Sequence, residues 1–123
     1  MGLKEKMQLR TRNHALEVIS LCNQLSRNTQ NQIISKQLLR ASCSVGANYR
    51  AVARAKSTAD FINKLYVVEE EADEALFWLE LLLELEPVFK DKILACSSEM
   101  NEILSIVVTS RKTARKNLNN FSN

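Results

Sequence analysis

Apolar residues recur every three to four positions along most of the 123-residue chain, and only short polar breaks interrupt this helical period. The clearest stripe runs through Ile34, Leu38, Ala41, Val45, Tyr49 and Val52. The period predicts four helices, at about residues 4–26, 31–56, 58–86 and 88–117. Two glycines and one proline leave few turn residues for a β-fold. The sequence therefore predicts one all-α domain, an up-and-down four-helix bundle with short connections.

Local patterns add detail to two of these helices, the first and the third. The first helix has a stripe that we expect to face the core, formed by Ala15, Val18, Ile19, Cys22 and Leu25. Ser57 can cap the third helix, and Asp60 three residues later favours a start that resembles a capping box. Pro87 ends the third helix, because proline disfavours helical backbone in the residue before it.

Small residues fill the middle of the second helix, within QLLRASCSVGANYRAVARAKS at residues 37–57. Gly46 lies among them, and glycine inside a helix costs about 1 kcal/mol relative to alanine. Small side chains let two helix backbones approach closely. We therefore predict close packing of the second helix on the third, with Phe77 and Trp78 filling the space. The alternative is a kink or a break near Gly46.

The third helix is apolar on more than one face, as the segment LFWLELLLEL shows. One buried stripe is enough for a helix in an isolated bundle. The additional apolar width, and a further apolar run at residues 106–108, predict a second buried surface against another subunit.

The cysteines and the apolar runs indicate where in the cell the protein is expected. Cys22, Cys43 and Cys96 are odd in number and lack metal-ligand spacing, and no secretory leader is recognisable. We expect reduced thiols in the cytoplasm, with all three cysteines acting as small core residues. The longest apolar run is interrupted by glutamates and is too short for a bilayer, so no membrane span is predicted.

Three pieces of the second and third helices carry a family resemblance: QLLRAS and SVGAN, then DFI-KL, then EEADEALFWLELL. They resemble the bacterial four helix bundle proteins, also called 23S rRNA-intervening sequence proteins. Relatives of that family are accessory proteins of diversity-generating retroelements. The resemblance implies a homopentamer, nucleic-acid binding, and a protein partner such as a reverse transcriptase. It implies structural roles for Arg40, Gly46, Asn48, Lys64, Glu71, Glu74 and Trp78.

Charge is unevenly placed along the chain. Residues 1–56 carry ten Lys or Arg and two Glu, residues 57–102 carry three Lys and twelve acids, and residues 103–123 carry four bases and no acid. In an up-and-down bundle, the start of helix one, the connection between helices two and three, and the end of helix four share one end. This basic pole comprises Lys4, Lys6, Arg10, Arg12, Arg50, Arg54, Lys56, Arg111, Lys112, Arg115 and Lys116, with Glu5 and Asp60 as the expected nearby acids.

Two interpretations of the basic pole stay open. Such a surface attracts the phosphates of RNA or DNA with little sequence preference. Cations are also favoured at helix C-termini by the helix dipole, without any ligand. The dipole does not explain the cations at the start of the first helix.

An acidic pattern in the third helix is the best candidate for catalysis. Glu70, Glu71 and Glu74 form EExxE, and Glu99 and Glu102 form ExxE on the next helix. Similar motifs hold Mg²⁺ in all-α NTP pyrophosphatases. The other interpretation is structural, with some of these glutamates paired with Arg40, Arg50 or Lys64. His14 has no second metal ligand at a suitable spacing, and we expect a surface or packing role.

The sequence as a whole predicts a non-enzymatic oligomer, an accessory or scaffold protein that binds nucleic acid through its basic pole. No catalytic residue, metal site or cofactor is predicted. The first alternative is a protein-interaction module without nucleic-acid binding, and the second is the Mg²⁺-dependent pyrophosphatase.

Overall fold

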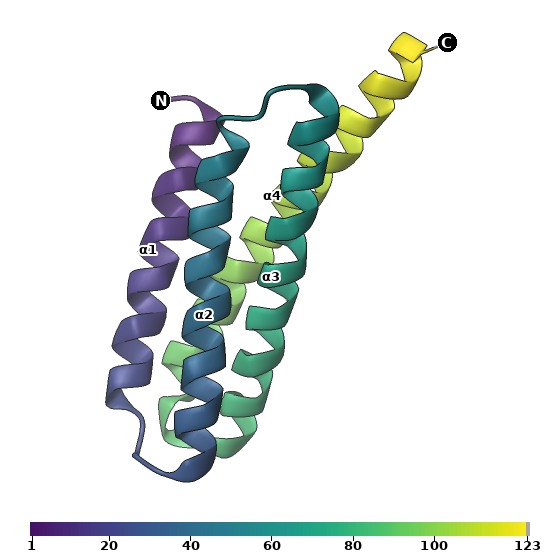
Figure 1. The fold of residues 1–123 in the computed structure, drawn as a ribbon. Coiled ribbons are helices and arrows are strands. Elements are labelled where there is room, and N and C mark those ends of the chain that lie inside the picture. Colours follow the sequence, from purple (N-terminus) through teal and green to yellow (C-terminus); the bar gives the residue numbers. More distant parts are fainter. Residues whose placement is uncertain (123) are drawn as a thin grey trace.

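Four α-helices run alternately up and down in the computed structural model, which describes residues 1–122 (Figure 1). They are α1 (Leu3–Gln24), α2 (Thr29–Val52), α3 (Thr58–Leu85) and α4 (Lys90–Ser122), with a 3-10 turn, η1 (Pro87–Phe89), before α4. Each helix packs on the next along the chain, and α1 and α4 close the bundle with the sparsest contact. The prediction of an all-α four-helix bundle is confirmed.

Capping residues and proline mark the observed helix ends more accurately than the spacing of apolar residues does. Ser57 caps α3, since its Oγ accepts a hydrogen bond from the Asp60 amide at 3.1 Å. The Asp60 carboxylate in turn accepts the Lys56 amide at 3.0 Å. The backbone is extended at Ser57, and α2 already ends at Val52 and not at residue 56 as predicted. Pro87 opens η1, which delays α4 to Lys90, and α4 continues to Ser122, past the predicted end at 117.

The core is built from one stripe of each helix, and the six predicted residues of α2 are all buried. The predicted buried face of α1 is partly wrong. Thr11 and His14 lie on the buried stripe of α1, whereas Ile19 is 37% exposed. Both polar side chains find backbone partners, because the Thr11 hydroxyl donates to the Gln8 carbonyl oxygen and His14 contacts the Cys96 carbonyl oxygen. Polar residues satisfied in this way interrupt an apolar pattern without leaving the core.

The three cysteines do not share one environment. Cys96 is buried and Cys22 partly buried, and burial raises the pKa of both thiols, that of Cys96 to about 11. Cys43 is exposed, so its predicted place in the core is wrong. It lies on the outer edge of α2, one turn before Gly46 and outside the apolar stripe.

The partner of Gly46 is α1, and the predicted packing against Phe77 and Trp78 of α3 is wrong. A Cβ atom at Gly46 would lie 3.6 Å from the carbonyl oxygen of Thr11. The predicted alternative, a break in the helix, is also wrong, because α2 is continuous from Thr29 to Val52. Trp78 instead packs edge to face on Phe77, with 4.9 Å between ring centroids. The small residues of α2 thus bring α2 close to α1.

The space at Gly46 gives a stability prediction. A distance of 3.6 Å is an ordinary van der Waals contact, so Gly46→Ala is expected to fit and to stabilise the fold by up to about 1 kcal/mol through helix propensity. The measurement is the free energy of unfolding in urea. Ala47→Gly, on an exposed position of the same helix, should lower stability by a similar amount. A destabilised Gly46→Ala variant would mean that α1 and α2 approach more closely than described.

The outer surface of α3 keeps part of its predicted apolar width. Phe77 is 49% exposed, and Tyr66, Val67 and Leu85 are also exposed. Leu82, in contrast, is fully buried in the core. None of the helices formed by residues 1–122 combines the length and apolarity needed to cross a bilayer.

Candidate nucleic-acid interface

The three segments of the basic pole meet at one end of the bundle. The N-terminus, the connection between α2 and α3, and the last turns of α4 lie together at the top of Figure 1. A surface hollow joins them, lined by Lys4 from α1, residues 55–58 and Phe61 around the start of α3, and Ala114, Asn117 and Leu118 from α4. The Lys4 ammonium lies 5.8 Å from the centroid of the Phe61 ring.

Two members of the predicted basic pole are ion-paired. Arg10 donates from Nε to Glu99 at 3.0 Å and from Nη2 to Glu102 at 2.6 Å, which joins α1 to α4. Arg111 donates from Nε to Glu69 at 2.7 Å, and its guanidinium lies 4.4 Å from the Tyr66 ring centroid.

These contacts change the charge of the basic pole. Hydrogen bonds to the carboxylates raise the pKa of both arginines, chiefly through Glu99 for Arg10 and Glu69 for Arg111. The expectation that Glu5 and Asp60 are the only nearby acids is therefore wrong. Glu99, Glu102 and Glu69 neutralise two guanidinium groups, because the rotation of α3 and α4 turns these acids toward them.

The other nine cations of the basic pole are exposed. None of them forms an ion pair within the described part of the chain, and we call them the free cations of the pole: Lys4, Lys6, Arg12, Arg50, Arg54, Lys56, Lys112, Arg115 and Lys116. The nearby Asp60 is held by Lys64, whose Nζ lies 2.7 Å from both carboxylate oxygens. Lys64, followed by the Lys56 amide, lowers the pKa of Asp60.

The remaining motif residues make contacts between helices and within single helices. Arg40 pairs with Glu71 at 3.1 Å and also with Glu74, which links α2 to α3. Of the three cations considered as partners for the glutamates, only Arg40 takes this role, since Lys64 pairs with Asp60. Asn48 donates to the carbonyl and hydroxyl oxygens of Ser44, both at 2.8 Å.

The two acidic patterns do not form one site. Glu71 and Glu74 face Arg40, whereas Glu99 and Glu102 face Arg10. Across residues 1–122, no group of three or more His, Cys, Asp or Glu side chains could hold a metal ion. The four glutamates are therefore divided between two groups of ion pairs, one that joins α2 to α3 and one that joins α1 to α4.

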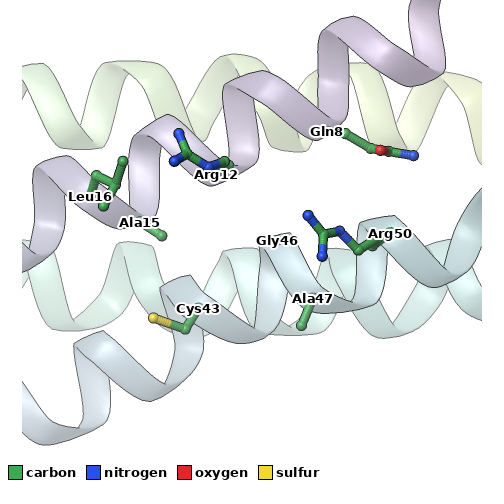
Figure 2. A pocket seen from close by; sticks show the side chains of 8 residues that line it. All are labelled: Gln8, Arg12, Ala15, Leu16, Cys43, Gly46, Ala47 and Arg50. Atoms are coloured by element: carbon green, nitrogen blue, oxygen red, sulfur yellow. The ribbon is translucent and has the colours of Figure 1, made fainter.

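A groove between α1 and α2 begins beside the basic pole (Figure 2). It has a volume of about 350 Å³, and we call it the small-residue groove: Gln8, Arg12, Ala15, Leu16, Cys43, Gly46, Ala47 and Arg50. Arg12 comes from α1 and Arg50 from α2, and the small residues of the groove are Ala15, Cys43, Gly46 and Ala47 (Figure 2). The sequence pattern indicated the small residues of α2 but not the contribution of α1, which depends on how α1 is rotated.

Comparison with known proteins identifies the family. The family model of the 23S rRNA-intervening sequence protein matches residues 5–109. The chain belongs to this family. A protein of unknown function from the S23 ribosomal protein family of Bacteroides thetaiotaomicron is 31% identical to the chain, with a TM-score of 0.80. That similarity covers 89% of this chain and 97% of the other protein. No curated protein matches the chain.

Only some cations of the basic pole lie within the residues that match the family model. The cations of α1, of α2 and of the α2–α3 connection, apart from Lys4, lie within the matched residues 5–109 of the 23S rRNA-intervening sequence protein. The four cations of α4 lie beyond residue 109, and one of them, Arg111, still pairs with Glu69 of α3. This part of α4 therefore adds positive charge outside the matched residues.

Proposed function

We propose that the protein is a non-enzymatic, oligomeric accessory or scaffold protein that binds RNA or DNA phosphates through its basic pole. One observation carries this proposal: nine exposed cations from three chain segments gather at one end and lack ion pairs within residues 1–122. Repulsion between like charges is costly, and phosphates relieve it.

The proposed binding has little sequence preference. The free cations are exposed on α1, α2 and α4 and in the α2–α3 connection, where lysine and arginine side chains reach phosphates whatever the bases are. Contacts to phosphates position a protein on nucleic acid without reading its sequence. Affinity should therefore depend on the charge and length of the nucleic acid.

The proposal includes self-association and a protein partner. Exposed Phe77, Leu85 and Val67 on α3 support a further buried surface. A homopentamer is the proposed assembly, with a mass by light scattering of about five times 14.0 kDa. A reverse transcriptase is the proposed protein partner. The proposed location is the reducing cytoplasm, which the three free cysteines support.

Salt dependence tests the nucleic-acid part of the proposal. Because bound phosphates release condensed counterions, affinity for a labelled RNA is expected to fall about 10³-fold between 50 and 200 mM salt if about six phosphates are contacted. Fluorescence anisotropy measures this, and DNA of equal length should bind comparably.

Two other results would replace this proposal. No RNA or DNA binding at 50 mM salt would favour a protein-interaction module. Mg²⁺-dependent release of pyrophosphate from a nucleotide, lost in Glu71→Gln, would favour an enzyme.

A further inference from the structure

The bundle carries a second groove, between α3 and α4, whose chemistry complements that of the small-residue groove. We call it the acidic groove, and its lining residues are Tyr66, Glu69, Glu70, Asp73, Leu104 and Val108. Glu70 and Asp73 are exposed and form no ion pair within the described residues, whereas Glu69 is paired with Arg111. Two unpaired carboxylates thus lie beside an apolar surface.

The two grooves lie on opposite sides of the bundle. The helices pack in chain order around the bundle, so the α1–α2 face and the α3–α4 face point away from each other (Figure 1). Residues 43–50 of α2 and 66–73 of α3 both lie within about 23 Å of the α2–α3 connection, at about 1.5 Å per residue. Both grooves are therefore on the half of the bundle next to the basic pole.

Charge and apolar surface match between the two faces. The small-residue groove offers the exposed guanidinium groups of Arg12 and Arg50, neither of which has an ion pair among residues 1–122 (Figure 2). Beside it, α1 exposes Leu9 and Leu16, one heptad apart. The acidic groove offers two free carboxylates beside the apolar side chains of Leu104 and Val108. At Tyr66 it adjoins the cations of α4, and Arg111 lies over the Tyr66 ring, so the complementary charge is confined to Glu70 and Asp73.

We propose that the small-residue groove of one copy of this chain docks on the acidic groove of a second copy. In this contact, α3 of the second copy enters the groove between α1 and α2, and Glu70 and Asp73 meet Arg12 and Arg50. The inference rests on the proposed self-association and assigns the faces that carry it. The contact is heterologous, so each copy uses both faces and the chain of contacts closes into a ring where the rotation allows.

A second copy fits these faces better than nucleic acid does. A phosphate backbone would pair with Arg12 and Arg50 but would gain nothing from the small and apolar side chains of the groove. With these two arginines in the contact between copies, the other seven free cations of the basic pole are the ones that bind phosphates. The acidic groove repels phosphates, and the proposed contact covers its carboxylates. Because both faces lie near the same end of the bundle, side-by-side copies place their basic poles on one side of the assembly. This arrangement concentrates positive charge where nucleic acid is proposed to bind.

Charge exchange tests the assignment, with the mass measured by light scattering in the absence of nucleic acid. The double variants Arg12→Glu/Arg50→Glu and Glu70→Arg/Asp73→Arg each place like charges across the contact. Each alone is expected to fall from the mass of the unmodified assembly to about 14.0 kDa. One chain with all four changes should regain the mass of the unmodified assembly, because every contact again joins opposite charges. Circular dichroism checks that each variant remains helical.

A matched pair of reversals at the other end, Arg27→Glu/Lys90→Glu, is expected to keep the assembled mass. Unchanged mass in both groove variants, or no recovery in the chain with all four changes, would overturn the assignment of faces while the proposed self-association stands. An unmodified protein that stays monomeric at high micromolar concentration would overturn the self-association itself. The two failures are therefore distinguishable.

Discussion

Reversing three free cations of the basic pole is expected to lower RNA affinity by about 100-fold or more at 50 mM salt. The variant is Lys56→Glu/Lys112→Glu/Arg115→Glu, whose positions are exposed and unpaired in the described chain. Each change removes a phosphate contact and adds a repulsive charge, so the steepness of the salt dependence should also fall. Fluorescence anisotropy with one labelled RNA measures both quantities.

The control for this variant has the same net charge. Arg27→Glu/Lys36→Glu/Lys90→Glu reverses three exposed cations away from the basic pole, and it should weaken binding less than about 10-fold through long-range charge alone. Equal losses in the two variants would mean that net charge governs binding and that the pole has no special role. Arg10→Gln and Arg111→Gln should change affinity little, since glutamates already hold both guanidinium groups.

His14 is expected to make the stability of the bundle depend on pH near neutrality. Its side chain is 2% exposed, Nε2 lies 3.0 Å from the Cys96 carbonyl oxygen, and Nδ1 has no partner in the described structure. Burial lowers the pKa of His14 and outweighs the Cys96 carbonyl oxygen, Glu99 and Glu17, which favour the protonated form. Protonation would bury a charge and leave an unmatched N–H at Nδ1.

The direction in which stability changes with pH follows from the lowered pKa of His14. Below about pH 6.5 the unfolded chain binds a proton at His14 that the folded chain does not, so stability is lost as the pH falls below that value. The loss is at most about 1.4 kcal/mol per pH unit for one group. Urea unfolding at pH 7.5, 6.0 and 5.0 measures it. Above pH 7 the contribution is fully present.

His14→Gln is the matched control, because glutamine has no titrating group and can still donate to the Cys96 carbonyl oxygen. This variant should show a flatter stability profile between pH 5 and 7. Asp60 acts in a separate window: Lys64 lowers its pKa, so its contribution is lost only as the pH falls below the usual range of a carboxyl group. The same pH dependence in the unmodified protein and in His14→Gln would assign the effect to other groups.

Features that depend on neighbouring residues along the chain could be read from the sequence. The stripe of α2 from Ile34 to Val52 is buried as its period predicts, because an α-helix repeats at the same interval wherever it packs. Ser57 and Pro87 mark the ends of α3, since capping and proline sterics act within a few residues. The bundle follows from four such stripes that must be buried together. The family resemblance of α2 and α3 was likewise visible in short local motifs.

Contacts between helices were decided only by the tertiary structure. Arg10 reaches Glu99 and Glu102 across 89 and 92 residues of chain, and Gly46 meets Thr11 and not Trp78. The rotation and height of each helix set these contacts, and both follow from the packing of all four helices at once. Charge along the sequence showed where cations gather. Which cations remain free at the basic pole, and which are neutralised, depends on acids that only the packed α3 and α4 bring within a few ångströms of them.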